Sequence, residues 1–497
     1  MAKEEYLTSP PKIATMPPGV PYIVGNEAAE RFSYYGMNSI LTIFMTKYLL
    51  DKMGHLSVMQ PANAEAWYHT FVSTLYFLPI FGAILADAVF GKFKVVFWIS
   101  IVYCLGHLTL ALMGSPVAHA IEPRYLLAIG LVLIAIGAGG IKPCVSTNVG
   151  DQFGESNKHL LTRVFNWFYF SINAGSAFST LLIPWLLEPG SIWDWLRNLL
   201  PVSLADFLVS PRLHSPDVAF GLPGVFMAVA TVIFWMGRKK FVHIPPVGLR
   251  TYAREIFNKE TGKIILNVLM PVPFVAIFWA LWQQNFSSWI VQAESMDRHL
   301  FGVDWLSSQI QTVNPIFILI MLPLFSYWLY PFVEKFVRLT PLRKIGAGLF
   351  VTAASFFLVA MIQTRIDAGA RPGIIWQVWA FVILTAGETL VSPTHLEFSY
   401  TQGPIKLKSL VMCTYLFAVS LGNQFTAAVN FFIQNPDGTV KLQGASYFMF
   451  FVWVMLGTAV LFAIIAPFYK GRTYLQDQAE APTAAEPAIG FVVQPEA

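Results

Sequence analysis

The chain has 497 residues, of which 56% are hydrophobic and only 12% are charged. Soluble globular domains carry about 25% charged residues, so the composition excludes a water-soluble fold and predicts several membrane-spanning segments. The formal net charge of +4 is too small to indicate a nucleic-acid partner. Three cysteines, Cys104, Cys144 and Cys413, lie in apolar runs and predict neither a disulfide framework nor a metal site.

The first 20 residues are polar and rich in proline, and they lack the apolar core of a cleavable signal peptide. We therefore expect the first spanning helix to act as the targeting signal.

Twelve runs are apolar enough to cross a bilayer, which takes about 20 residues of helix. The first six are Pro21–Leu50, Trp67–Gly91, Lys94–Met113, Tyr125–Gly150, Leu161–Leu187 and Val218–Gly237. The second six are Ile264–Val291, Ile310–Val333, Gly346–Ile362, Ile374–Tyr400, Lys408–Ile433 and Tyr447–Tyr469. This pattern predicts an all-α membrane protein with twelve transmembrane helices in two six-helix bundles and a path between them.

The longest basic connection, residues 238–263, separates the two sets of runs and is predicted to be a cytoplasmic linker. It follows a cytoplasmic segment (1–20) and an N-terminal bundle (21–237), and it precedes a C-terminal bundle (264–469) and a disordered cytoplasmic tail (470–497) rich in Ala, Pro and Glu. With the twelve predicted spans, most of the 32 Lys and Arg residues lie on the same side of the membrane as the N-terminus. The positive-inside rule then places both termini in the cytoplasm of a cell membrane, the inner one in a bacterium.

The first run carries Glu27, Glu30 and Arg31 at helical spacing with Tyr34 and Asn38, so all five share one stripe. A charge deep in a bilayer costs several kcal/mol unless it is paired or hydrated. The stripe therefore predicts a water-lined path. The alternative is a static ion-pair network that ties helices together.

Lys142 follows a cluster of glycines in the fourth run, where glycine permits close helix approach or a bend. A buried amine needs a partner, and Glu388 in the tenth run is the best candidate. The alternative is that the two are unrelated polar residues. His69, near the outer end of the second run, suits either a proton relay or a packing role.

Five segments carry a family resemblance. The sequence from Gly82 to Lys94, GAILADAVFGKFK, resembles the loop signature of the major facilitator superfamily. The others are EAAERFSYYG from Glu27, GIKPCVSTNVGDQF around Lys142, FYFSINAG from Phe168 and ETLVSP from Glu388. These four are similar to signatures of the proton-dependent oligopeptide transporter family, and the resemblance covers about Tyr22 to Tyr469.

The resemblance implies a role for each matched residue. It implies proton coupling for Glu27, Glu30, Arg31, His69 and Glu388. It implies peptide binding for Tyr34, Tyr35, Tyr76, Lys142, Asn173, Trp279, Asn314, Glu388, Ser392 and Tyr415. It implies gating for Asn38, Gln283 and Asp87.

Two positions depart from the family pattern. Asn38 stands where members commonly have Arg, and Gln283 stands at an acidic position. Losing one partner of a buried ion pair costs about 3–5 kcal/mol, whereas losing both leaves two amides that can hydrogen-bond. The matched depth of the two residues predicts a neutral outer gate. The alternative is that their side chains never meet.

The sequence thus predicts a proton-coupled symporter that imports di- and tripeptides by alternating access, working as a monomer without a cofactor. A related symporter of a small anion such as nitrate is the alternative, which Glu388 disfavours because an anion needs no ligand for an amine. A membrane enzyme is disfavoured because the sequence has no recognisable nucleophile–base pair, metal set or nucleotide loop. The charge-lined path disfavours a non-transporting scaffold. The expected partners are small peptides, protons and the lipid bilayer.

Overall fold

The computed structural model of the chain describes residues 6–188, 213–401, 408–435 and 439–469, together with residues 190, 201 and 210. The predicted cytoplasmic tail therefore lies outside the described residues. Apart from a short hairpin of β1 (His299–Leu300) and β2 (Val303–Asp304), the described elements are helices. This confirms the predicted all-α class.

The first half of the chain forms helices α1 to α9, which we call the N-terminal helices. Their bounds are α1 Val20–Ile43, α2 Pro61–Phe77, α3 Pro79–Ile84, α4 Lys92–Ala111, α5 Pro123–Asp151, α6 Leu161–Leu187 and α9 Pro216–Met236. Short π-helical segments, Phe44–Tyr48 and Leu85–Phe90, continue α1 and α3.

The second half begins with α10 (Leu249–Ile256), and we call α11 to α19 the C-terminal helices. Their bounds are α11 Lys259–Val268, α12 Val272–Trp282, α13 Ser288–Glu294, α14 Val313–Leu324, α15 Tyr330–Glu334, α16 Pro341–Asp367, α17 Ile375–Thr401, α18 Lys408–Phe432 and α19 Ala445–Ile465. The seventh predicted run is broken twice, at Pro271 and by a 3-10 turn from Gln283 to Phe286. A second 3-10 turn, Ser307–Thr312, precedes α14.

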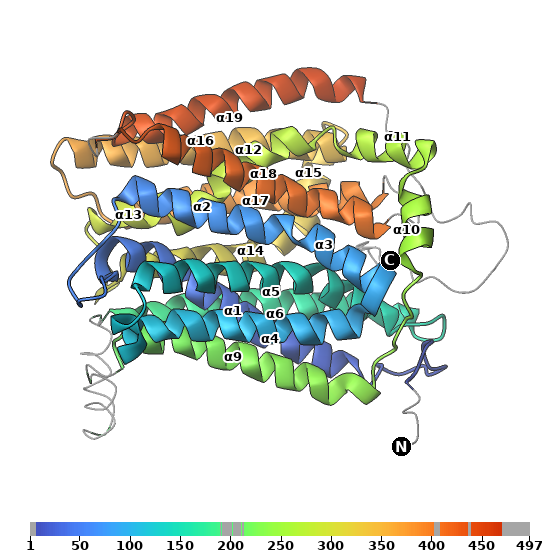
Figure 1. Ribbon diagram of the computed structural model, residues 1–497. Helices are drawn as coiled ribbons and strands as arrows, with labels where there is room; N and C mark the ends of the chain where they lie inside the picture. The colour runs from blue at the N-terminus through green and yellow to red at the C-terminus, as the bar shows by residue number, and fades with distance from the viewer. Residues whose placement is uncertain are drawn as a thin grey trace.

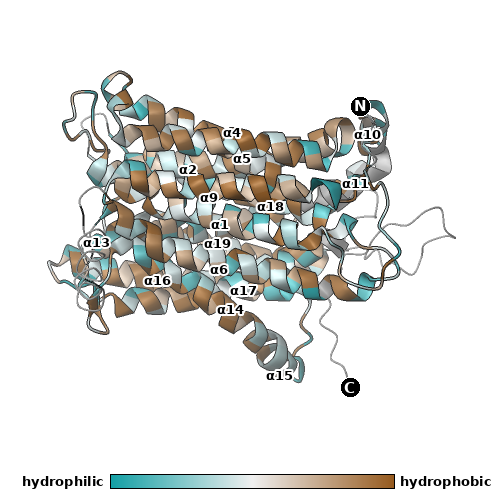
Figure 2. Cartoon of the chain, turned by 90° about the horizontal axis from the view of Figure 1, so that it is seen from below, coloured by the Kyte–Doolittle hydropathy of each residue, from teal (hydrophilic) through white to brown (hydrophobic). Residues whose placement is uncertain are grey.

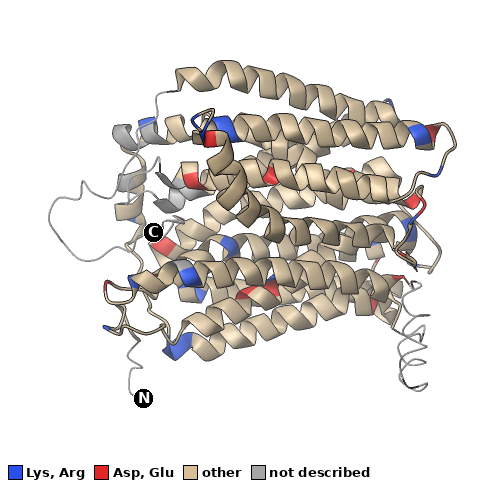
Figure 3. Cartoon of the chain, turned by 180° about the vertical axis from the view of Figure 1, so that it is seen from behind, with Lys and Arg blue, Asp and Glu red and all other residues tan. Residues whose placement is uncertain are grey.

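Each of the twelve predicted runs contains helix. In the described residues, nine helices are long and apolar enough to cross a membrane by length and composition. Figure 2 shows hydrophobic residues along most of the helix lengths, and Figure 3 shows charged residues gathered mainly toward the helix ends. The exact number of twelve crossings stays a prediction.

The helices pack mostly within their own half of the chain. Among the N-terminal helices, α1 packs against α6 and α9, and α4 against α5 and α9. Among the C-terminal helices, α16 packs against α17 and α19, and α12 against α18. The two halves meet chiefly where α2 lies beside α18 and α6 beside α14 (Figure 1).

Glycines let α5 approach its neighbours closely, as the sequence predicts. A Cβ atom added at Gly139 would lie 2.7 Å from Leu78 Cβ, and one at Gly82 would lie 2.8 Å from the Cα atom of Gly140. Both distances are below any normal carbon–carbon contact. This close packing carries Lys142 into the centre of the molecule.

We call the end that holds the α1–α2 connection, residues 49–60, the outer end, following the predicted orientation. Figure 1 shows α13 near this end and α10 at the opposite one, which we call the inner end.

Candidate functional site

The three charged residues of α1 form one buried cluster, which we call the central cluster. Arg31 Nε lies 2.7 Å from Glu27 Oε1 and 3.1 Å from Glu30 Oε2. Both carboxylates are 2% exposed. The helical spacing predicted from the sequence is confirmed, and one guanidinium serves two carboxylates.

Lys142 lies next to this cluster without an anionic contact of its own. Its ammonium stands 4.4 Å from the centroid of the Tyr34 ring and 5.4 Å from that of Tyr76. Its Nζ is buried and has no hydrogen-bond partner among the described residues. The electrostatic interactions of Lys142 are with Arg31, Glu30 and Glu27.

Glu388 occupies the corresponding place among the C-terminal helices. Its Oε2 accepts a hydrogen bond from Trp282 Nε1 at 2.8 Å and another from Asn314 Nδ2 at 2.7 Å. Asn314 also donates to Thr385 Oγ1 at 3.0 Å. The predicted Lys142–Glu388 pair was wrong, because Glu388 is held by neutral donors and Lys142 by aromatic faces.

Aromatic side chains surround Glu388. Trp279 packs edge-on against Trp282, with ring centroids 5.2 Å apart, and against Tyr415, at 5.9 Å. The hydroxyls of Tyr415 and Ser392 are 2.8 Å apart. The predicted binding residues Trp279, Asn314, Ser392 and Tyr415 therefore lie together with Glu388.

Aromatic rings connect the two sets of residues. Tyr35 of α1 stacks on Phe286 with ring centroids 6.3 Å apart, and Phe286 lies 6.0 Å from Trp282, which donates to Glu388. Asn173 lies on α6, where its Nδ2 donates to the backbone carbonyl of Tyr169 at 2.9 Å. We call these two sets of residues together the central site. The N-terminal set is Tyr34, Tyr35, Tyr76, Lys142 and Asn173, and the C-terminal set is Trp279, Trp282, Asn314, Glu388, Ser392 and Tyr415.

Beyond the central site, toward the outer end, polar groups join the two halves of the chain. Asn38 Nδ2 donates to the Tyr68 hydroxyl at 3.1 Å, and this hydroxyl donates to Gln283 Oε1 at 3.4 Å. All three side chains are buried. Asn38 and Gln283 are therefore connected, but through Tyr68 rather than directly.

His69 forms a second connection one residue further along α2. Its Nδ1 lies 2.8 Å from Asn423 Oδ1, and its Nε2 lies 2.9 Å from Ser287 Oγ. A neutral imidazole satisfies both contacts, donating to the amide oxygen and accepting from the hydroxyl. We call these residues the outer seal: Asn38, Tyr68, His69, Gln283, Ser287 and Asn423.

Two further features reinforce the closure of the outer end. The 3-10 turn after α12 leaves the Phe286 carbonyl free to accept from Thr42 Oγ1 at 2.8 Å. At the rim, Lys47 of the N-terminal half forms an ion pair with Glu294, which also lies 2.8 Å from Arg298 Nη1. Burial raises the pKa of Glu294, but the hydrogen bond from Lys47 and the charges of Arg298 and Lys47 outweigh it, so the pKa lies below its ordinary value.

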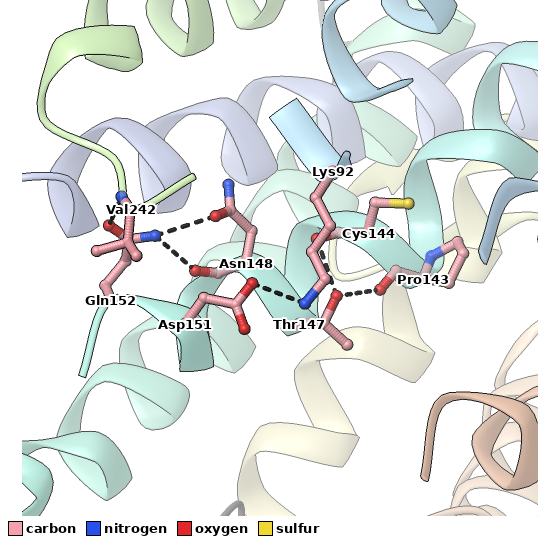
Figure 4. Close-up of polar contacts among 8 residues, drawn as sticks. All are labelled: Lys92, Pro143, Cys144, Thr147, Asn148, Asp151, Gln152 and Val242. Carbon is pink, nitrogen blue, oxygen red and sulfur yellow. Dashed lines mark hydrogen bonds and ion pairs between the residues drawn. The ribbon is translucent and has the colours of Figure 1, made fainter. Parts of the chain in front are cut away.

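The inner end of α5 carries a network within the N-terminal helices (Figure 4). Lys92 Nζ lies 2.6 Å from Asp151 Oδ2. Gln152 donates to Asn148 and accepts from the backbone nitrogen of Val242, which ties α5 to the linker. The backbone carbonyl of Asp87 accepts from Val247 at 2.9 Å, so the predicted gating residue also contacts the linker.

Sequence reasoning missed three residues that hold the site together. Trp282 donates to Glu388, Tyr68 bridges Asn38 and Gln283, and Asn423 contacts His69. A signal existed for Trp282, which follows Trp279 by three positions and so shares its helix face. No local signal marks Tyr68 or Asn423, whose partners lie far away in the chain.

Comparison with known proteins gives a consistent result. A model of the POT family matches residues 93–256 and 250–449. The chain is 33% identical over 391 residues to peptide transporter 3 of Caenorhabditis elegans, covering 72% of this chain and 52% of that protein. It is 33% identical over 401 residues to human solute carrier family 15 member 2, covering 72% and 50%. The chain thus spans about half the length of the curated relatives it matches.

Solved structures are similar over nearly the whole chain. The crystal structure of the POT family transporter PepTSo superposes with a TM-score of 0.77 at 31% identity, covering 92% of this chain and 99% of that one. An auto-inhibited POT family peptide transporter has a TM-score of 0.77 at 29% identity, covering 94% and 99%.

Proposed function

The chain belongs to the POT family and is a multi-pass membrane protein with the major facilitator fold, and from this premise we propose that it is a proton-coupled symporter that imports di- and tripeptides by alternating access. The family model and the relatives named as peptide transporters support this assignment. It describes a transporter rather than an enzyme.

One observation carries the proposal. The central site offers an unpaired ammonium, Lys142, on one side and a carboxylate held by neutral donors, Glu388, on the other. A small peptide has a carboxylate at one end and an ammonium at the other, and charge-assisted hydrogen bonds are the strong ones. Peptide binding gives Lys142 the anion it lacks and Glu388 a cation.

The aromatic residues suit a substrate whose side chains vary. Trp279, Tyr76 and Tyr415 offer apolar faces that make no demand on a particular polar group. Recognition then falls on the two ends of the peptide. Tyr34 and Asn173 are assigned, with Lys142, to its carboxylate end and backbone, and Tyr35 is a further binding residue.

Proton coupling is assigned to the central cluster. A proton on Glu27 or Glu30 leaves Arg31 with one carboxylate instead of two, and Lys142 interacts electrostatically with all three residues. The charge state of the cluster therefore sets how favourably Lys142 receives a peptide carboxylate. His69, within the outer seal, is assigned the entry step of the proton.

The contacts of the outer seal join the two halves of the chain at the outer end in this structure. We assign outer gating to Asn38 and Gln283 and inner gating to Asp87. The two six-helix units, the cytoplasmic position of both termini and function as a monomer are parts of the same proposal, and lipid is the surrounding solvent.

Uptake of labelled dialanine into proteoliposomes tests the proposal. We expect accumulation above equilibrium when an inward proton gradient is imposed, and only slow equilibration without one. Uptake at the same rate and to the same level with and without the gradient would contradict proton coupling. Absence of dialanine uptake, together with binding of a small anion such as nitrate, would contradict the peptide substrate and favour the anion.

A further inference from the structure

A buried carboxyl group outside the central site joins the two halves of the chain. Glu65 lies near the outer start of α2 and is 6% exposed. Its Oε2 accepts a hydrogen bond from the Tyr447 hydroxyl of α19 at 3.1 Å. That hydroxyl in turn accepts from Asn430 Nδ2 of α18 at 3.1 Å.

No positive charge in the described part of the chain compensates this carboxyl group. Among the described residues no lysine, arginine or histidine forms an ion pair with Glu65, in contrast to Glu27, Glu30 and Glu294. The outer part of α18 presents the amides Asn423 and Asn430 and no titratable group. The titratable or charged groups at the outer end of its own helix and of the elements packed against it include His69 and Tyr68 of α2, Tyr447 of α19, Glu294 of α13, Lys47 and Tyr48 beyond α1 and Arg124 of α5.

These neighbours are already engaged elsewhere. His69 contacts Asn423 and Ser287, Lys47 pairs with Glu294, and Arg124 donates to Ser57. A carboxylate that is buried with one hydroxyl donor and no cation costs several kcal/mol. The neutral acid avoids this cost and still accepts from Tyr447.

Opening the outer end changes this balance. Glu65 belongs to the N-terminal helices and Tyr447 to the C-terminal helices, so separation of the two halves breaks their hydrogen bond and admits water to the carboxyl group. In water the ionised form is the ordinary one near neutral pH. Closing and opening therefore bind different numbers of protons, and pH acts on the equilibrium between them.

We propose that Glu65 is an outer proton lock, separate from the proton-coupling cluster, which takes up a proton from the outer solution as the outer end closes. The proton returns to the same side when the outer end reopens. The lock therefore favours closure in acid but adds no proton to those carried across the membrane. This proposal rests on alternating access, which is part of the proposed function, but not on the identity of the substrate.

The test measures closure directly, without substrate. Spin labels at Met53→Cys and Phe301→Cys report the outer separation, because both positions are 75% or more exposed and lie on opposite halves of the chain. The three native cysteines are first replaced by serine or alanine, and distances are recorded in nanodiscs from pH 5.5 to 8. One linked proton changes the ratio of closed to open forms by at most about tenfold per pH unit.

We expect the closed fraction to rise in acid, and Glu65→Gln to reduce the slope of the logarithm of this ratio against pH by up to one. Gln retains the acceptor for Tyr447 and mimics the neutral acid, so the variant should stay closed at pH 8. Glu122→Gln, at a half-exposed carboxyl group at the outer end, is the matched control and should leave the slope unchanged. An unchanged slope in Glu65→Gln would overturn the proposal.

A second variant covers the case in which Glu65→Gln does not fold. Tyr447→Phe removes the donor and leaves the carboxyl group, so closure should require more acid than in the wild type. A midpoint unaltered by Tyr447→Phe would count against the lock. Proton-to-peptide stoichiometry, measured from reversal potentials, should be the same in wild type and Glu65→Gln; a decrease would make Glu65 a transported site instead.

Failure of the proposed function is separable from failure of the lock. If no peptide is transported but closure still depends on Glu65, the substrate assignment falls and the lock stands. If peptide transport is proton-driven but closure has the same pH dependence without Glu65, the proposed function stands and the lock is wrong.

Discussion

The central cluster and the outer seal are both buried, but they are built from different chemistry. The central cluster combines two carboxylates and a guanidinium, and the ammonium of Lys142 lies beside it. The outer seal joins the two halves of the chain through amides, hydroxyls and an imidazole. The cluster lies within one half, whereas the seal lies between halves.

This difference follows from what each region has to do. Under the proposed alternating access, contacts of the seal form and break in every cycle, and burying neutral groups costs far less than burying ions when one of the partners moves away. Under the same proposal the central site needs charge, because a proton can redistribute only among titratable groups and because charge-assisted hydrogen bonds bind the charged ends of a peptide strongly. The predictions below test this difference between charged and neutral buried groups.

Neutralising one carboxylate of the central cluster should have the largest effect. We expect Glu30→Gln to abolish uptake driven by a proton gradient, because Arg31 then has a single titratable partner. Exchange of labelled for unlabelled dialanine should remain, since it needs no net proton movement. Glu155→Gln, with a side chain 82% exposed, is the control. Full concentrative uptake by Glu30→Gln would remove the cluster from the coupling mechanism.

Placing a charge in the outer seal should come next. Asn38→Arg puts a cation beside the Tyr68 hydroxyl at a position that is 1% exposed. An unpaired buried charge costs about 3–5 kcal/mol, so the population of the outer closed state and the transport rate should fall by about two to four orders of magnitude. Adding Gln283→Glu supplies a counter-charge, and the double variant should recover part of the loss.

The bridge through Tyr68 sharpens this test. If Asn38 and Gln283 communicate through its hydroxyl, a double-mutant cycle on transport rate should show coupling between Asn38→Ala and Gln283→Ala that disappears in a Tyr68→Phe background. Phe is chosen over Trp at position 68 because Trp is bulkier than Tyr. Strictly additive effects in the wild-type background would mean that the two amides act independently.

The sequence predicts the helices well because long apolar runs leave few alternatives in a bilayer. Hydrophobicity misplaces the end of a helix where the buried stretch includes a polar residue. The second run is predicted from Trp67, but α2 begins at Pro61, because Ala64, Glu65 and Ala66 are buried against other helices. Glu65 thus fell outside the predicted span.

The site is predictable as a set of residues but not as a set of pairs. Motif positions identify Lys142, Glu388, Asn314 and the α1 charges. Which of them pair depends on the distance and rotation between helices that are far apart in sequence, and periodicity within one helix carries no information on either. This is why Trp282, rather than Lys142, is found at Glu388.

Weakening recognition in the central site should have an intermediate effect. A hydrogen-bonded charge contributes about 1.5–3 kcal/mol, so N-acetylation of dialanine should weaken its competition for wild-type uptake by roughly 10–100-fold. Glu388→Gln should narrow the difference between capped and free dipeptide. Equal inhibition by both forms in the wild type would point to a substrate other than a peptide.

The rim pair, where the seal region does use ions, should show the smallest effect. Lys47 and Glu294 have side chains 36% and 19% exposed, and pairs of this kind contribute about 0.2–1 kcal/mol. Lys47→Gln should therefore shift the outer closed fraction no more than about fivefold, and high salt should reproduce that shift in the wild type through screening. Lys52→Gln, at an exposed lysine of the α1–α2 connection that follows Lys47, is the control.

The pH dependence of the rim pair distinguishes it from the neutral seal. Because the pKa of Glu294 lies below its ordinary value of 4.5 when the outer end is closed, its contribution is fully present above that value and is lost as pH falls through the lowered pKa. Between pH 6 and 8 the rim pair should therefore give no pH dependence to closure. The spin-label distance between positions 53 and 301, measured in Lys47→Gln and wild type at both pH values, should show a constant ratio of closed fractions. A ratio that changes across this interval would mean that Glu294 titrates there, and that the rim, rather than Glu65, sets the response of the outer end to acid.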